Sequence, residues 1–465
     1  MKKILFTGII SLFVLQALSQ TEDSVFIRRI ADEVLVNGKA YDDLRVLTKQ
    51  VGGRLTGSPQ MVKAEQWGLK TMQAINPDRA WLQECMVPHW VRGGKDEATA
   101  MYNASRPGNA KQISQNTKKL DVIALGNSKG SGKAGVRSEV MEVSSFDELE
   151  AKKDLVKNKI VFYNYPFNQK FVKTFEAYGD AVGYRGQGAS RAAKYGAKAV
   201  IVRSMSEGTY NYPHTGAMRY DSSYPQIPAL AIGLLDADWL SSTLKNGTVS
   251  VSLKTYGHFL PDTIGHNVIA ELKGTDFPNE YITIGGHLDS WDPAEGAHDD
   301  GAGVVQTIEV LRVLKALGYK PKHSIRFVLF ANEENGSRGG RKYAEEAQAK
   351  GEKHIFALES DEGGFTPRGF SLTGTDQQYQ KLAGWQALLC PYGGCEISKG
   401  GGGADIGPLA TTQQTPVCGL NPDSQRYFDV HHARNDVFEN VNKRELLLGA
   451  VNMAALVYLV DKYGL

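Results

Sequence analysis

The chain has 465 residues, which is more than one ordinary domain needs and enough for a large core plus a second unit. Its 53 basic residues nearly balance 51 acidic ones, and no basic run resembles a nucleic-acid-binding arm or a polybasic membrane patch. The hydrophobic content of 42% and the 50 glycines favour a globular α/β protein with many tight loops over a disordered chain.

The first residues have the pattern of a secretory signal peptide. Two lysines precede an apolar run from Ile4 to Leu18, and small and polar residues follow. The run is shorter than the roughly 20 apolar residues of a spanning helix, which disfavours a membrane anchor. We therefore expect residues 1–19 to be a signal peptide and the mature protein to be secreted or periplasmic, without a stable membrane anchor.

Two helices are predicted near the N-terminus of the mature chain. Apolar residues recur at spacings of three and four from about residue 24 and again over 60–75, on either side of the turn "GGRLTGSP". From about residue 118 to 260 the pattern changes to short β-type runs such as "KIVFYNYP" and "KAVIVRS", with helical stretches near 185–195 and 235–245. This block holds no cluster of metal-ligating or nucleophilic residues, so we expect an inserted domain that shapes or covers a site.

After this block, strands and helices alternate as in βαβ units. The predicted strands are "EYITIGG", "HSIRFVLFA" and "HIFALES", and the helices between them are 303–318 and 336–350. The nearly continuous apolar strand 323–331 is typical of a parallel sheet that is covered on both faces. The prediction is an α/β fold with a mostly parallel sheet flanked by helices, formed by residues 20–117 and 261–465.

Each predicted strand ends in residues that bind metals or move protons. The candidates are His287 and Asp289, then Asp299 and Asp300 in the following turn, Glu333 and Glu334, the group Glu359, Asp361 and Glu362, and His431, His432 and Asp436 near the C-terminus. Because ligands of open parallel sheets bind at the carboxyl ends of the strands, these segments are expected to converge on one edge.

The convergence favours a metal site over the ordinary roles of the single residues. Asp299 or Asp300 alone would more often cap a helix, and a lone histidine is usually structural. Two histidines among several carboxylates are the ligands of a divalent ion, and so many acids in one cleft would repel one another unless cations neutralised them. A carboxylate that bridges two ions would also fix their separation.

Four cysteines remain in the exported chain. They are Cys85, Cys390, Cys395 and Cys418. The segment "CPYGGC" could close a small loop through Cys390 and Cys395, or all four could be free buried thiols, and both alternatives stay open.

The motifs "NVIAELKGTDFPNEYITIGGHLDSW", "GAHDDGAG", "FANEENGSRG", "ESDEGG" and "HHARND" occur in this order. Together with "GGRLTGSP" they resemble the co-catalytic dizinc exopeptidases, the family of aminopeptidases and glutamate carboxypeptidases, over nearly the whole mature chain. The resemblance implies a phosphorylase/hydrolase-like fold, and it implies that residues 118–260 form a protease-associated-like, β-rich insertion.

The resemblance also implies a role for each site residue. Two zinc ions per chain are expected, one on His287 and Asp361, the other on Glu334 and His432, with Asp299 bridging. Glu333 would be the general base and acid, and Asp289 would be the catalytic-site carboxylate that orients His287. His432 is preferred to His431 because Asp436 lies four residues after it, as in the family pattern. Asp300 would support the site, with a cis peptide bond to Asp299.

The expected function is hydrolysis of dipeptides or short peptides by a water that two metals activate and Glu333 deprotonates. The resemblance further implies a homodimer. A single-zinc glutaminyl cyclase and a metal-free, receptor-like scaffold are the alternatives. Asp405 in "GGGADIGPL" could face a substrate amino group, and Tyr210, Tyr212 and His214 could be lid contacts, although ordinary loops explain both patterns as well.

Overall fold

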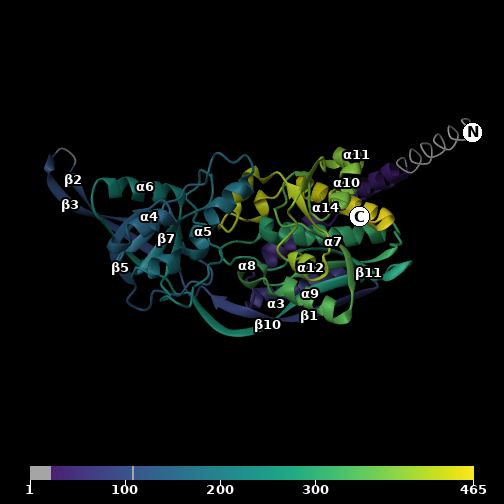
Figure 1. The fold of residues 1–465 in the computed structure, drawn as a ribbon, viewed down its shortest axis with the longest axis horizontal. Coiled ribbons are helices and arrows are strands. Elements are labelled where there is room, and N and C mark those ends of the chain that lie inside the picture. Colours follow the sequence, from purple (N-terminus) through teal and green to yellow (C-terminus); the bar gives the residue numbers. More distant parts are fainter. Residues whose placement is uncertain (1–21, 107–108) are drawn as a thin grey trace, which may run out of the picture.

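The computed structural model describes residues 22–106 and 109–465, so the expected signal peptide lies outside the described residues. The elements form two bodies side by side along the long axis of the molecule (Figure 1). One body contains β11 (Phe277–His287) and α7 (Ala302–Ala316), and the other contains β7 (Ala199–Arg203) and α5 (Thr174–Ala193). Two long strands of the first body, β1 (Arg79–Val91) and β10 (His258–Leu272), pair with each other and flank the second body in the sequence.

Within the described residues, the first sheet has eight strands in the order β1-β10-β12-β11-β13-β16-β14-β15. Its other strands are β12 (His323–Phe330), β13 (Lys353–Glu359), β14 (Pro367–Thr373), β15 (Glu396–Lys399) and β16 (Val417–Pro422). The central strands β12, β11, β13 and β16 are parallel to one another, and antiparallel neighbours flank them on both sides. The predicted mostly parallel sheet is confirmed, and the carboxyl ends of its central strands share one edge.

Helices cover both faces of this sheet. On β12, Phe327 and Leu329 face one core cluster while Val328 and Phe330 face another, because side chains alternate along a strand. The first face carries α2 (Ala40–Val46), α3 (Pro59–Ala74), α7 and α14 (Lys443–Tyr463), and the second carries α9 (Arg338–Lys350) and α12 (Gly407–Gln413). Burial on both faces explains why 323–331 reads as a continuous apolar run.

Helix α14 is the one helix of the described residues that is long and apolar enough to cross a membrane. Of its most apolar stretch, 83% is buried inside the protein, against α7 and the sheet. The apolar character of α14 is therefore that of a core helix.

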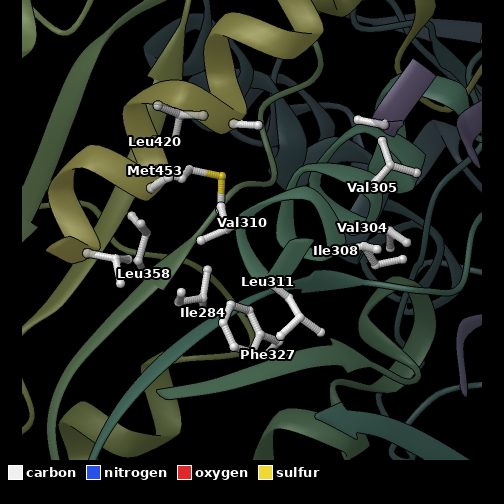
Figure 2. Close-up of a cluster of buried hydrophobic side chains, with 14 of the residues drawn as sticks. Ile284, Val304, Val305, Ile308, Val310, Leu311, Phe327, Leu358, Leu420 and Met453 are labelled. Carbon is white, nitrogen blue, oxygen red and sulfur yellow. The ribbon is translucent and has the colours of Figure 1, made fainter. Parts of the chain in front are cut away.

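Leu311 on α7 offers a direct test of the core. Its side chain is fully buried in the cluster that also contains Ile284 and Phe327 (Figure 2). Replacing Leu311 by alanine should lower the free energy of unfolding by about 2 to 5 kcal/mol, because a cavity is added to the lost transfer energy. Urea unfolding measures this change, and Leu235→Ala, at a side chain that is 57% exposed, should cost less than about 1 kcal/mol. Equal losses would contradict this description of the core.

The second body contains a separate sheet, with the described strand order β3-β2-β9-β5-β6-β7-β8-β4. Its strands besides β7 are β2 (Glu97–Arg106), β3 (Asn109–Leu120), β4 (Val122–Ala124), β5 (Val136–Val143), β6 (Ile160–Tyr163), β8 (Ala229–Ile232) and β9 (Val249–Lys254). Helices α4 (Phe146–Ala151), α5 and α6 (Leu234–Lys245) pack on it. This arrangement is the β-rich insertion that the resemblance implies.

The strand pairing changes the expected limits of the insertion. Residues 97–117 were expected in the peptidase domain, but β2 pairs with β9 and β3 pairs with β2, so both belong to the second sheet. Residues 258–260, expected in the insertion, begin β10 of the first sheet. We therefore propose that the insertion spans 97–254, and we call this segment the inserted unit.

Helix α5 begins earlier than the predicted helical stretch at 185–195. It starts at Thr174 and includes four glycines, which have low helix propensity and hide the pattern in the sequence. One of them, Gly188, is required by close packing, since a Cβ there would lie 2.8 Å from the ring of Tyr163. Tertiary packing therefore stabilises this helix, and residue 185 lies in its middle and not at its start.

Of the two alternatives for the cysteines, the structure shows the one with a disulfide in "CPYGGC". Cys390 and Cys395 form a disulfide, whereas Cys85 and Cys418 are free and buried. The disulfide joins the end of α11 (Gln386–Leu389) to the start of β15, far in the sequence from the candidate metal ligands.

Candidate metal centre

The predicted site residues meet at the carboxyl edge of the central strands. His287 ends β11, and Asp361 follows β13 by two residues. Glu333 and Glu334 form the first turn of α8 (Glu333–Gly336), directly after β12. Asp299 lies in the turn Ala297–Gly301 before α7, and His432 follows α13 (Tyr427–Val430). Five separate segments therefore supply one cluster, at the edge where open parallel sheets bind ligands.

One half of the cluster consists of His287, Asp299 and Asp361, which we call the first ligand group. The Nε2 atom of His287 lies 3.2 Å from Asp299 Oδ1 and 3.1 Å from Asp361 Oδ1. His287 and Asp299 are buried, whereas the Asp361 side chain is 24% exposed. One imidazole nitrogen and two carboxylate oxygens thus face a common point, as the ligands of a divalent metal do.

The other half consists of His432, Asp299 and Glu334, which we call the second ligand group. The Nε2 atom of His432 lies 3.1 Å from Asp299 Oδ2 and 3.1 Å from Glu334 Oε2. Asp299 Oδ2 is buried and lacks hydrogen-bond geometry toward any described group. Asp299 therefore turns one oxygen to each group, the arrangement that a carboxylate between two metal ions needs.

His431 is close but less well placed than its neighbour. Its Nε2 is 3.8 Å from Asp299 Oδ2, and its ring stacks on that of His432 with 3.6 Å between the ring centroids. Burial lowers the pKa of His431 well below its usual range, so this ring is neutral. The distances favour His432 as the ligand, with His431 as a packing surface behind it.

The pKa shifts of the side chains in the cluster indicate that its carboxylates outnumber the positive charges around them. Burial raises the pKa of Glu334 to about 7 and that of Glu333 well above its usual range. Although burial opposes charge on His432, Glu334 and Asp299 raise its pKa to about 10, and Asp361 and Asp299 raise that of His287. Both imidazoles thus hold protons where a bound cation would stabilise the carboxylates. The residues fit a pair of divalent metal ions.

Glu333 and Glu334 have different surroundings although they are adjacent. The preceding residue, Asn332, has a left-handed backbone with φ of 62°, so the strand has ended and alternation no longer applies. Glu334 belongs to the second ligand group, and its other carboxylate oxygen accepts a hydrogen bond from the main-chain N–H of Trp291. Glu333 is half-buried and lines the open cleft.

Asp289 supports Glu333 more directly than it supports His287. The Nδ1 atom of His287 lies 2.9 Å from the main-chain oxygen of Asp289, but 3.8 Å from the Asp289 carboxylate. That carboxylate instead accepts hydrogen bonds from the main chain of Glu333, at 3.0 Å, and from the hydroxyl of Thr56, at 2.9 Å. The expected contact is therefore made by the main chain, and the side chain positions the turn that carries Glu333.

Asp300 and Asp436 hold the backbone around Asp299. The Asp299–Asp300 peptide bond is cis, as the resemblance implies. Asp300 accepts hydrogen bonds from the main chain of His287 and of Gly303, at 3.0 and 2.9 Å. Asp436 accepts from the main chain of His298 and of Asp299, at 2.8 and 3.1 Å, and does not bond the His432 ring. Both acids therefore position the backbone that carries Asp299.

The "GGRLTGSP" motif lies beneath the site. Arg54 is fully buried and donates hydrogen bonds to the main-chain oxygens of Leu288, Glu295 and Gly296, at 2.5, 2.8 and 3.1 Å. This single guanidinium thus joins the start of the loop after β11, at Leu288, to the residues just before the turn that contains Asp299. The motif thus stabilises the backbone of the site, and Thr56 adds the bond to Asp289.

A cleft of about 620 Å³ opens onto the cluster. Besides the ligands and Glu333, its walls include Asn127, Phe175, Tyr178, Arg185 and Arg219 from the inserted unit. No pattern in the sequence of 97–254 marks these residues, because an irregular surface that faces a second body has no period. The inserted unit therefore forms one wall of the candidate site.

Four other candidates do not line this cleft. Asp405 is fully buried and cannot face a substrate. Tyr210 and Tyr212 stack on each other beside a separate cavity, with ring centroids 5.4 Å apart. His214 is buried within the inserted unit.

The model of peptidase family M28 matches residues 267–457 of this chain. Carboxypeptidase Q of Mus musculus is 32% identical over 423 residues, which are 91% of this chain and 85% of that protein.

Two solved structures are similar over most of the chain. A peptidase M28 precursor from Shewanella amazonensis SB2B has 31% identity and a TM-score of 0.87, covering 95% of this chain and 97% of that one. A zinc aminopeptidase from Bacillus subtilis has 20% identity and a TM-score of 0.62, covering 90% and 94%, and this likeness concerns the fold.

Proposed function

The chain belongs to peptidase family M28 and is a metallo-exopeptidase, and we propose that it is an exported enzyme with two zinc ions that hydrolyses dipeptides or short peptides. Export rests on the pattern of residues 1–19, and the homodimer stays a prediction from the resemblance. The observation that carries the two-metal proposal is the position of Asp299, which supplies one oxygen to each ligand group.

The chemistry would be divided among a few side chains. His287, Asp361 and Asp299 would hold one zinc, and His432, Glu334 and Asp299 the other. Bound zinc supplies Lewis acidity, which polarises a scissile carbonyl and acidifies a water molecule. Glu333, on the cleft wall with a pKa raised by burial, would take the proton from that water and return it to the leaving amine. Asp289 holds the main chain of Glu333 during both transfers.

The cleft also suggests which peptide terminus is recognised. Arg185 lines it, donates to the Tyr178 hydroxyl at 2.5 Å, and has a buried Nε without a hydrogen-bond partner among the described residues. Its Nη1 lies 3.3 Å from His432 Nδ1. A guanidinium with unused donors beside a metal ligand suits a carboxylate. We therefore favour substrates with a free C-terminus, the specificity of a carboxypeptidase or dipeptidase.

Replacing Arg185 by methionine should reduce kcat/KM roughly 30-fold or more for a dipeptide with a free carboxylate, because a desolvated charge pair is lost. The same change should have little effect on the C-amidated dipeptide, which the wild-type enzyme should cleave slowly. Steady-state kinetics on the two substrates measure the difference. Arg191→Met removes an exposed arginine from the same helix and is the control. Equal losses of kcat/KM on the free-carboxylate dipeptide and on the C-amidated dipeptide would contradict carboxylate recognition by Arg185.

Zinc content and a substrate panel test the function as a whole. Purified protein should contain two zinc ions per chain and should cleave dipeptides in preference to N-blocked or C-amidated peptides. One zinc per chain with cyclisation of N-terminal glutamine would support the glutaminyl cyclase instead. Protein without bound zinc or hydrolytic activity would support the scaffold.

A further inference from the structure

The inserted unit touches the second ligand group through the main chain of one residue. The N–H of Thr215 donates a hydrogen bond to the main-chain oxygen of His432 at 3.0 Å. In return, the Nδ1 atom of His432 lies 3.3 Å from the main-chain oxygen of Thr215. His432 has a left-handed backbone, with φ of 60°, and this pair of contacts holds both its backbone and its ring.

The hydrogen on the imidazole decides what the second contact does. The Nε2 atom of His432 faces Asp299 and Glu334, so it is the atom that would bind a metal. Nδ1 then carries the hydrogen and needs an acceptor. The other neighbour of Nδ1 is Arg185, which can only donate. Among the described residues, the Thr215 carbonyl is thus the acceptor available to this ring.

Thr215 is itself fixed inside the inserted unit. Its fully buried hydroxyl donates to the main-chain oxygen of Ala124 at 2.8 Å. The next residue, Gly216, has φ of 126°, and a Cβ there would lie 2.6 Å from both His432 Nδ1 and the Arg185 guanidinium. The segment is thus held close to the His432 ring and has no room for a side chain at residue 216.

We propose that the inserted unit contributes directly to the metal centre. Its Thr215 carbonyl orients the His432 ring and so sets the zinc affinity of the second ligand group. This inference rests on the proposed two-zinc function. Thr215 is then a positioning residue, and zinc binding at the second ligand group depends on the position of the inserted unit relative to His432.

The test uses the full-length mature protein and measures zinc affinity by competition with a chelator. Thr215→Val removes the anchoring hydroxyl without changing the size of the side chain. It should weaken one of the two zinc sites about 10- to 100-fold and leave the other unchanged, which is the usual effect of losing an outer partner of a metal-binding histidine. Thr243→Val is the matched control, because Thr243 makes the same hydroxyl-to-carbonyl bond, 2.8 Å to Trp239, within α6 of the same unit.

A double-mutant cycle assigns the affected site. In a chain that carries His432→Ala, Thr215→Val should have no further effect on zinc affinity, whereas with Asp361→Ala its effect should persist. Gly216→Ala provides a second variant that pushes on the ring directly, and Gly186→Ala, where a Cβ meets no atom within 4 Å, is its control. Gly216→Ala should weaken the same site by a similar factor.

Unchanged affinity in both Thr215→Val and Gly216→Ala would overturn the inference, as would equal weakening of both zinc sites. Because the measured quantity is zinc affinity and not peptide hydrolysis, failure of this inference can be distinguished from failure of the proposed peptidase activity. A protein that binds two zinc ions and loses one in these variants, yet cleaves no peptide, would uphold the role of Thr215 and contradict only the peptidase activity.

Discussion

Replacing Asp299 by asparagine is expected to remove both zinc ions and to reduce peptide hydrolysis at least about 10³-fold. The two oxygens of Asp299 lie 3.2 Å from His287 Nε2 and 3.1 Å from His432 Nε2, so this one carboxylate serves both ligand groups. Asparagine keeps the shape but loses the negative charge and turns an amide nitrogen toward one group. Zinc per chain after dialysis, with kcat/KM on a dipeptide, measures the effect.

Asp300→Asn is the matched control, since the same change is made one residue away. Asp300 accepts two main-chain hydrogen bonds, from His287 and Gly303, and its carboxylate does not belong to either ligand group. The amide oxygen of asparagine can keep one of those bonds. Zinc should therefore stay bound, with activity reduced by a smaller factor. Equal losses of zinc in the two variants would refute the division between ligand and support.

Replacing Glu333 by glutamine should leave two zinc ions bound while kcat falls about 10²- to 10⁴-fold, the range for loss of a general acid–base group. Glu333 belongs to neither ligand group but lines the cleft beside both. Its main-chain bond to Asp289 does not depend on the side chain, so the turn should keep its position. Zinc analysis and steady-state kinetics on one preparation separate binding from turnover.

Glu362→Gln controls for the loss of a half-buried carboxyl near the site. Glu362 accepts a hydrogen bond from Asn421 at 3.1 Å and is absent from the cleft wall, so activity should change less than about tenfold. Near-normal turnover in Glu333→Gln would exclude Glu333 as the base. Loss of zinc in that variant would make it a ligand instead.

The convergence of the candidate metal ligands could be predicted because it follows from local patterns. His287, Glu334 and Asp361 each lie at or just after the end of a strand with a clear apolar run, and the carboxyl ends of parallel strands meet at one edge. The distances to Asp299, 3.1 Å for His432 against 3.8 Å for His431, also favour His432 as the ligand, which stays a prediction. The spacing to Asp436, by which the resemblance prefers His432, does not reflect a contact with this imidazole, because Asp436 accepts a hydrogen bond from the main chain of Asp299.

Other features depend on contacts between segments far apart in the sequence. Strands β2 and β3 look like ordinary polar strands, and only the pairing of β2 with β9 and of β3 with β2 assigns them to the inserted unit. Arg185 lies in a glycine-rich helix without a clear apolar period, and Thr215 lies in a loop. Neither position carries a local signal for its contact with His432, which is more than 200 residues later.

The sequence by itself determined the α/β fold, the strand ends that carry the ligands and the chemical type of the centre, since periodicity and residue type are local properties. The tertiary structure decided that Asp299 turns one oxygen to each ligand group, that the main chain of Asp289 holds His287, and that Thr215 of the inserted unit holds His432. These last features are orientations of groups between packed segments, and they exist only once the two bodies have come together.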